Sequence, residues 1–310
     1  MRIKFLYPLV FLLSVSPLVP QSLSLYKYNE KYGLINEECE IIEEQKFTSF
    51  IETKDYLICG ARSLSPRFYV YNKNGQKETG FDASFVKTVE KNIIYIDNIF
   101  DSSYWYDLEK KERIEYEDLY AGEIQVIFSY DTKDFEIRNP GGSVLKKNLR
   151  ECGYRFSEGL MPIKDSDGKT GFINESGEFV FECPIYGSHA IDDPKIHPLY
   201  DFEFSNGIVC VPESESSFAL YTKDGRKMKS VRNSRTEQRK FTSGYMLIST
   251  ADKSQRQYAF LNYKGENPFN RYFSEAKRFI NEYAMVVVDG KDAVINTKGD
   301  VFFCADFVNK

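Results

Sequence analysis

Histidine and tryptophan are scarce in this 310-residue chain, which holds two histidines and one tryptophan. Its six cysteines are widely separated and form no CxxC or CxxH pair, which excludes a zinc knuckle and specifies no disulfide pairing. No glycine-rich phosphate loop and no HExxH, GxSxG or SxxK motif stands in a supporting context. We therefore predict no catalytic residues, no cofactor and no resident metal.

An excess of positive charge is also missing, since 41 basic residues face 46 acidic ones and the net charge is −5. This balance gives no reason to expect nucleic acid as a partner. Charged residues make up 28% and hydrophobic residues 42%, so the chain is neither disordered nor a multi-span membrane protein. A length of 310 residues exceeds one typical domain of about 150 and predicts two domains or one extended array.

Residues 1–24 differ from the remainder and have the layout of a secretory signal peptide. Arg2 and Lys4 precede an uncharged apolar run that is shorter than the ~20 residues of a spanning helix. Ser22 and Ser24 occupy the −3 and −1 positions of a small-x-small cleavage site. We predict cleavage after Ser24 and export to the periplasm, the cell surface or the medium, with no transmembrane segment in the mature chain. An uncleaved anchor is the alternative.

An internal repeat organises residues 25–310. One eight-residue frame recurs eight times, and its first residues are Tyr32, Phe68, Tyr104, Asp134, Thr170, Phe218, Tyr258 and Asp292. The fifth position is asparagine in five copies, at Asn36, Asn72, Asn174, Asn262 and Asn296. The eighth is glycine in six copies, at Gly75, Gly141, Gly177, Gly225, Gly265 and Gly299. Asn-x-x-Gly is typical of a type I turn, and apolar residues flank it, so each frame predicts a β-hairpin.

A second element precedes the hairpin in the C-terminal copies: an aromatic residue, two small or polar residues, a glycine and an apolar strand. It begins at Phe156, Phe204 and Phe241, with a degenerate copy from Phe279. Each unit then has two to three short strands, which cannot bury a core alone and must stack on neighbouring units. No segment has a convincing helical period, so little helix is expected.

The predicted fold is therefore all-β, with about eight small antiparallel sheets stacked as an open or propeller-like array. Clear units are expected near residues 26–45 and 154–303, and degenerate units near 79–150. Three strands per unit and uneven spacing favour an open or irregular array slightly over a closed propeller, whose blades usually have four strands. Contact between the first and last units would indicate closure.

The string Lys31-Tyr-Gly-Leu-Ile-Asn36 resembles a WG (KWG) repeat, as do the strings 169–174 and 291–296. That bacterial family has a Lys-Trp-Gly-aromatic-Ile-Asp core, here with tyrosine, threonine or aspartate for tryptophan and asparagine for aspartate. The resemblance implies an exported repeat protein that acts as a binding or interaction module. It implies no catalytic residues.

The segment from Lys223 to Lys240 holds eight basic and two acidic residues, a charge of +6 in an otherwise acidic chain. It is expected to lie between hairpins, either as a solvated linker or as a docking surface for an anionic partner. The candidate binding residues are Lys227, Lys229, Arg232, Arg235, Arg239 and Lys240.

One further cluster holds both histidines: His189 and His197 flank Asp192 and Asp193. Such a loop could ligate a divalent cation, but a solvated loop is the commoner case, and no metal site is predicted.

The preferred function is an exported, non-enzymatic binding or scaffold module. Its partner would be a protein, an envelope polysaccharide or an anionic membrane surface. The alternative is a cell-envelope hydrolase that acts on glycan through a carboxylate pair. A cleft with paired carboxylates would favour that alternative.

Overall fold

The structure is a computed structural model. It describes residues 22–62, 66–90, 92–99, 101–115, 124–129, 131–153, 155–186, 202–237, 239–250, 252 and 256–308. Within these ranges the chain forms antiparallel β-strands and one short helix, α1 (Cys304–Val308), so the all-β prediction is confirmed. No helix of the described part is long and apolar enough to cross a membrane.

The strands form six antiparallel sheets in the described residues. The first sheet contains β1 (Ser24–Tyr28), β2 (Lys31–Ile35) and β3 (Ile41–Phe47). The second contains β4 (Ser49–Glu52), β5 (Tyr56–Ala61), β6 (Arg67–Asn72), β7 (Lys77–Glu90), β8 (Ile93–Asn98), β9 (Tyr104–Asp107) and β10 (Glu112–Ile114). The third contains β11 (Gln125–Ser129), β12 (Asp134–Arg138), β13 (Val144–Cys152), β14 (Leu160–Asp165), β15 (Thr170–Asn174) and β16 (Phe179–Glu182).

Three smaller sheets complete the chain. The fourth contains β17 (Ile208–Ser214), β18 (Ser217–Thr222) and β19 (Lys227–Arg232). The fifth contains β20 (Ser234–Thr236), β21 (Met246–Thr250) and β22 (Tyr258–Leu261). The sixth contains β23 (Glu275–Ile280), β24 (Tyr283–Val288), β25 (Lys291–Asn296) and β26 (Val301–Phe303). The eight frames fall on β2, β6, β9, β12, β15, β18, β22 and β25, one strand for each frame.

Two long strands explain why eight frames form six sheets. The first half of β7 pairs with β6, and its second half, from Ala83, pairs with β8. The strand β13 likewise pairs with β12 and then, from Leu149 onward, with β14. Each long strand ends one repeat and begins the next. We number the repeats as units one (β1–β3), two (β4–β7), three (β7–β10), four (β11–β13), five (β13–β16), six (β17–β19), seven (β20–β22) and eight (β23–β26).

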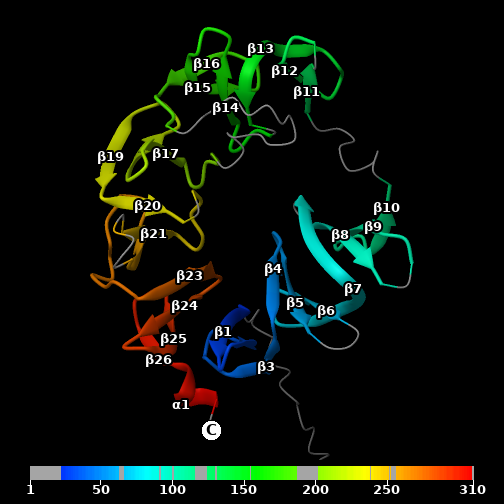
Figure 1. The fold of residues 1–310 in the computed structure, drawn as a ribbon, viewed down its shortest axis with the longest axis vertical. Helices are drawn as coiled ribbons and strands as arrows, with labels where there is room; N and C mark the ends of the chain where they lie inside the picture. Colours follow the sequence, from blue (N-terminus) through cyan, green and yellow to red (C-terminus); the bar gives the residue numbers. More distant parts are fainter. Residues whose placement is uncertain are drawn as a thin grey trace, which may run out of the picture.

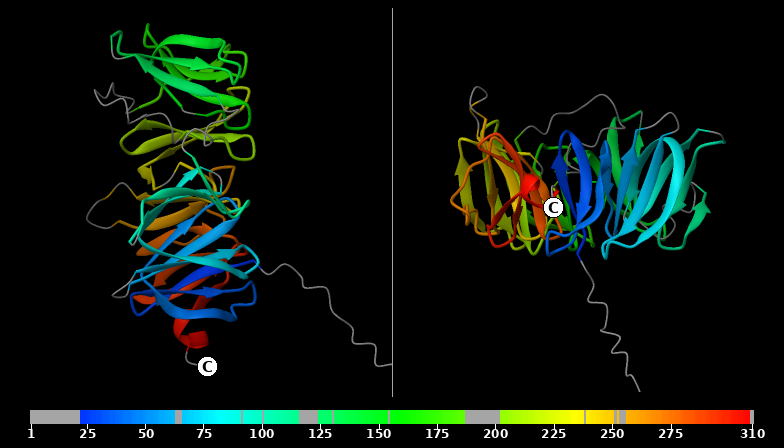
Figure 2. Two further views of the ribbon diagram at one scale, coloured as in Figure 1. Left: turned by 90° about the vertical axis from the view of Figure 1, so that its right-hand side faces the viewer. Right: turned by 90° about the horizontal axis from the view of Figure 1, so that it is seen from below.

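The units follow one another around a ring, and unit eight lies beside unit one (Figures 1 and 2). Leu25 and Met285 belong to one buried cluster that crosses this seam. The Ser24 hydroxyl donates to the Ile280 carbonyl at 2.6 Å, and the Tyr283 hydroxyl donates to the Glu37 carbonyl at 2.6 Å. The first and last units therefore touch. This contact indicates that the array is closed where its two ends meet.

Units three and four do not pack in the same way. Figure 1 shows the ribbons of β10 and β11 apart, and the apolar clusters of units two to three and four to five are separate among the described residues. The array is thus joined where units one and eight meet, which is the sign of closure and runs against the slight preference for an open array, whereas the ribbons of units three and four lie apart.

The Asn-x-x-Gly turns form as predicted. At Asn174 the backbone carbonyl accepts from the Gly177 amide at 2.9 Å, and the side-chain Oδ1 accepts from the Ser176 and Glu178 amides at 3.0 Å each. The Asn174 Nδ2 also donates to the Glu178 carboxylate at 3.2 Å. This last bond recurs in other units, so the acidic or amide residue after the glycine is part of the motif.

One turn glycine was assigned one residue too early. In unit four the turn runs from Asn139 to Gly142, which has φ +83°, and not to Gly141. Irregular pairing of β12 with β13 changes the register just before this turn, so the frame counted from Asp134 no longer marks its end.

The cysteines are all free thiols, and Cys39 alone is not fully buried. Burial raises the pKa of the Cys183 and Cys304 thiols to about 12, so these groups stay protonated and serve as small apolar core residues.

Candidate anion-binding site

The basic segment is not a linker between hairpins, contrary to the prediction. Its first part forms β19, the last strand of unit six, and its second part forms β20, the first strand of unit seven. Only Asn233, with φ +55°, separates the two strands. The segment therefore passes directly from the sheet of unit six to the sheet of unit seven.

The structure divides the six predicted binding residues into two groups. Lys227 forms an ion pair with Glu213, and its hydrogen bond holds the pKa of that carboxyl below its usual value. Lys240 lies 3.4 Å from the Glu203 carboxylate, and the aliphatic part of Lys229 lies against the turn of unit seven. Arg232 is exposed on β19. None of these four residues lines the cavity described next.

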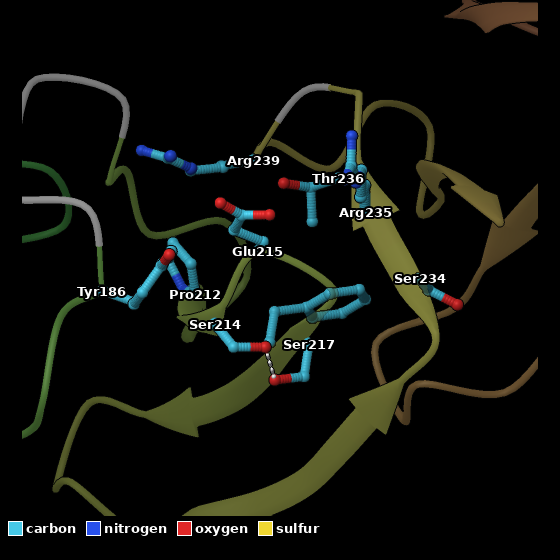
Figure 3. A pocket seen from close by; sticks show the side chains of 10 residues that line it. Tyr186, Pro212, Ser214, Glu215, Ser217, Ser234, Arg235, Thr236 and Arg239 are labelled. Atoms are coloured by element: carbon cyan, nitrogen blue, oxygen red, sulfur yellow. Dashed lines mark hydrogen bonds between the residues drawn. The ribbon is translucent and has the colours of Figure 1, made fainter. Parts of the chain in front are cut away.

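Arg235 and Arg239 line a cavity of about 440 Å³ (Figure 3). Its walls come from three consecutive units: the segment after β16, the β17–β18 turn and β20. The other lining residues are Tyr186, Pro212, Ser214, Glu215, Ser217, Phe218, Ser234 and Thr236. Cavities of this size, formed between packed elements with a few polar groups, are typical of small-ligand sites. We call it the arginine pocket.

Arg235 supplies the strongest chemical feature of the arginine pocket. Its side chain is half-buried, and its Nε is buried with no hydrogen-bond partner among the described residues. A guanidinium is always charged and carries five donors in a planar fork, so a buried unpaired donor is costly. Because Arg235 also lines the pocket, its guanidinium group can attract a carboxylate or another oxyanion there.

The second guanidinium is positioned by an aromatic ring. Arg239 lies over Phe202, with its guanidinium carbon 4.5 Å from the ring centroid. Figure 3 shows the Glu215 side chain between Arg239 and Thr236. The pocket therefore presents two guanidinium groups and one carboxylate, a net charge of +1.

Neutral polar groups complete the arginine pocket. The hydroxyls of Ser214 and Ser217 lie 2.6 Å apart, at the turn between β17 and β18. Tyr186 is 43% exposed, and its backbone amide donates to the Pro212 carbonyl at 3.0 Å, which fixes the start of its side chain beside the pocket. Hydroxyls beside guanidinium groups suit an anion that also carries hydroxyl or amide groups.

The candidate metal loop around His189, Asp192, Asp193 and His197 lies outside the described residues. Within the described residues, no group of three or more histidine, cysteine, aspartate or glutamate side chains could hold a metal ion.

No family model and no curated protein matches the chain. Among solved structures, the crystal structure of the eukaryotic initiation factor is 8% identical over 91% of this chain and 95% of its own, with a TM-score of 0.45. KlHsv2 with loop 6CD replaced by a Gly-Ser linker is 11% identical over 83% and 97% of the two chains, with a TM-score of 0.43. The dihydro-heme d1 dehydrogenase NirN in complex with DHE is 11% identical over 92% and 72%, also at 0.43.

The structural neighbours are β-propeller proteins. At these identities the likeness concerns the fold alone.

Proposed function

We propose that this chain is an exported, non-enzymatic binding or scaffold module, and that the arginine pocket receives an anionic group of its partner. The observation that carries the proposal is that Arg235 and Arg239 line the same cavity. Two guanidinium groups can hold a carboxylate through paired, charge-assisted hydrogen bonds. The WG-like frame supports the same class, because that family is regarded as a set of interaction modules.

The partner is a protein or an envelope polysaccharide with accessible carboxylates. A cavity that is bounded by three units suits a projecting group better than the flat face of an anionic membrane. The neighbouring Ser214 and Ser217 hydroxyls can bond the hydroxyls of a uronic acid or the amides of an acidic peptide. The chain as a whole is acidic, so attraction to such a partner depends on the local charge of this segment.

The experiment compares the binding of polygalacturonate and of poly-glutamate to the wild type and to two double variants. Arg235→Gln with Arg239→Gln removes both guanidinium groups from the arginine pocket. Lys223→Gln with Arg226→Gln removes the same charge from exposed positions of the same segment. Both polymers are used because they share the carboxylate and differ in backbone.

We expect the pocket variant to lose at least tenfold in affinity for one polymer, and the surface variant to stay within about threefold of the wild type. Binding should weaken between 0.01 M and 0.15 M salt, as the Debye length falls from ~30 Å to ~8 Å. Equal losses of affinity in the two variants would show that binding depends only on the overall electrostatic field of the segment. That result would contradict a role for the pocket.

One observation favours the hydrolase alternative. Glu275 and Asp292 both line a second cavity, at the seam, and burial raises the pKa of the Asp292 carboxyl. Glycosidases use a pair of carboxyl groups of which one stays protonated. Release of reducing ends from a glycan by the wild type, lost in Asp292→Asn, is the result that would favour an enzyme over a binding module.

A further inference from the structure

The seam cavity has a volume of about 330 Å³ and lies where unit eight meets unit one. Three units line it: Lys27 and Tyr32 come from the β1–β2 hairpin, Tyr258 comes from β22, and Met285 and Asp292 come from β24 and β25. Unit seven contributes to both cavities, through β20 in the arginine pocket and β22 in the seam cavity, but the two cavities share no lining residue. We call this second cavity the seam pocket.

The frame explains why these side chains meet. Tyr32, Tyr258 and Asp292 occupy the same first frame position in three units. In the sheets they pair with Lys27, Ser249 and Val287 on the preceding strand, so each lies at the same end of its sheet. The closure of the ring brings the three equivalent positions to one cavity.

Asp292 is the polar centre of the seam pocket. Burial is the main cause that raises the pKa of its carboxyl, and the nearby Glu30 and Glu275 act in the same direction, whereas Lys27 opposes them. Lys27 donates to the Glu30 carboxylate at 3.0 Å, so its ammonium already has a partner. Among the described residues, none donates a hydrogen bond to the Asp292 carboxylate.

We propose that the seam pocket binds a cationic side chain of a partner polypeptide, an ammonium or a guanidinium, with Asp292 as its counter-ion. The carboxylate would gain the donor that its half-buried position lacks. Tyr32 and Tyr258 offer aromatic rings to the cation, and Met285 offers apolar surface to the methylene groups of a lysine or arginine. The exposed Glu275 and Lys277 also line the pocket, and together with Lys27 and Asp292 they give it no net charge. The attraction of a cation therefore depends on the carboxylate of Asp292 itself.

The size of the seam pocket supports one side chain as occupant. A volume of about 330 Å³ is at the lower end of ligand sites, which run from about 300 to 1,000 Å³. This proposal is independent of the arginine pocket. If both are correct, the same ring binds acidic and basic groups at two separate places, which favours a polypeptide partner over a uniformly anionic polysaccharide.

The test is an NMR titration of the full chain, carrying ¹³C-labelled tyrosine, with Nα-acetyl-lysine methylamide. The matched probe is the same molecule acetylated on its side-chain nitrogen, which keeps the length and removes the charge. The variants are Asp292→Asn and Glu275→Gln, and Asp167→Asn is the control because Asp167 is exposed in unit five. Glu275→Gln changes an exposed residue, so it remains informative if Asp292→Asn does not fold.

We expect the charged probe to shift two tyrosine signals, to bind at least fivefold more tightly than the neutral probe, and to lose at least fivefold in Asp292→Asn. Glu275→Gln should weaken binding by a smaller factor, and Asp167→Asn should leave it unchanged. Equal binding of the two probes, no binding, or wild-type affinity in both Asp292→Asn and Glu275→Gln would overturn the proposal. Hydrolysis of a glycan that Asp292→Asn abolishes would also overturn it, because Asp292 would then be a catalytic acid.

Discussion

Gly225 turns so close to Phe181 of the preceding unit that a methyl group on its α-carbon would lie 2.4 Å from the Phe181 β-carbon. The same relationship recurs along the ring, since a methyl group on the α-carbon of Gly177, the turn glycine of unit five, would lie 2.4 Å from the Leu145 carbonyl oxygen of unit four. Gly142 of unit four is different, because no atom lies within 4 Å of the corresponding position. The turn glycines thus mark which units pack together, and the exception lies at the interruption between units three and four.

This relationship predicts the effect of two matched substitutions. Gly225 and Gly142 have φ values of +82° and +83°, so replacement by alanine costs both the same backbone strain, about 1 kcal/mol. Gly225→Ala also forces the turn away from Phe181, which should cost a further ~1–3 kcal/mol. Chemical denaturation should therefore give a larger loss for Gly225→Ala than for Gly142→Ala. Equal losses would show that units five and six are not packed at this turn.

The N-terminal residues of the described chain predict where processing must stop. Cleavage after Ser24, as the sequence suggests, would remove Leu23, which is 1% exposed and whose amide donates to the Lys73 carbonyl at 2.8 Å. It would also remove the Ser24 hydroxyl bond to Ile280. Burial of a leucine contributes about 2 kcal/mol and each hydrogen bond about 1 kcal/mol.

We therefore expect a chain that begins at Ser22 to melt at a higher temperature than one that begins at Leu25. If the chain is exported and processed, mass spectrometry of the mature protein should find Leu23 retained. An N-terminus at Leu25, or equal melting temperatures for the two chains, would contradict this prediction.

The Glu213–Lys227 pair predicts a pH dependence. The hydrogen bond from Lys227 lowers the folded-state pKa of Glu213 below its unfolded value. Its contribution to stability is therefore complete above the unfolded pKa, about 4.3, and is lost as the pH falls through the folded pKa. Lys227→Gln should lower the free energy of unfolding at pH 7, and the difference from the wild type should shrink below about pH 4.3. A difference that stays constant down to pH 2 would exclude this linkage.

The local structure of the repeat could be predicted because it is encoded over eight consecutive residues. Asn262 and Gly265 specify their turn through hydrogen bonds within five consecutive residues. The apolar residues before the turn specify the strand that leads into it. The frame failed by one residue at Gly142, where irregular strand pairing changes the count. It could not predict that β7 and β13 each serve two units, because a shared strand has the same alternating pattern as two separate ones.

The candidate site was only half predictable. Arg235 and Arg239 were found because they lie in a run of positive charge, but the same run includes Lys227 and Lys240, whose charges are paired with carboxylates elsewhere in the chain. Tyr186 lies in another unit and has no local signal in the sequence. Which cations face a cavity depends on how three units pack, and that information is not local.

The most direct test of the central claim is the ¹⁵Nε–¹H signal of Arg235 during a titration with polygalacturonate at low salt. Binding of an anionic group in the arginine pocket predicts a saturable shift of this signal, with the same affinity as the bulk binding curve, and its loss at high salt. The Arg232 signal, from an exposed arginine on the neighbouring strand, should move little. Equal shifts of Arg232 and Arg235, or binding of the polymer without any change at Arg235, would contradict the account.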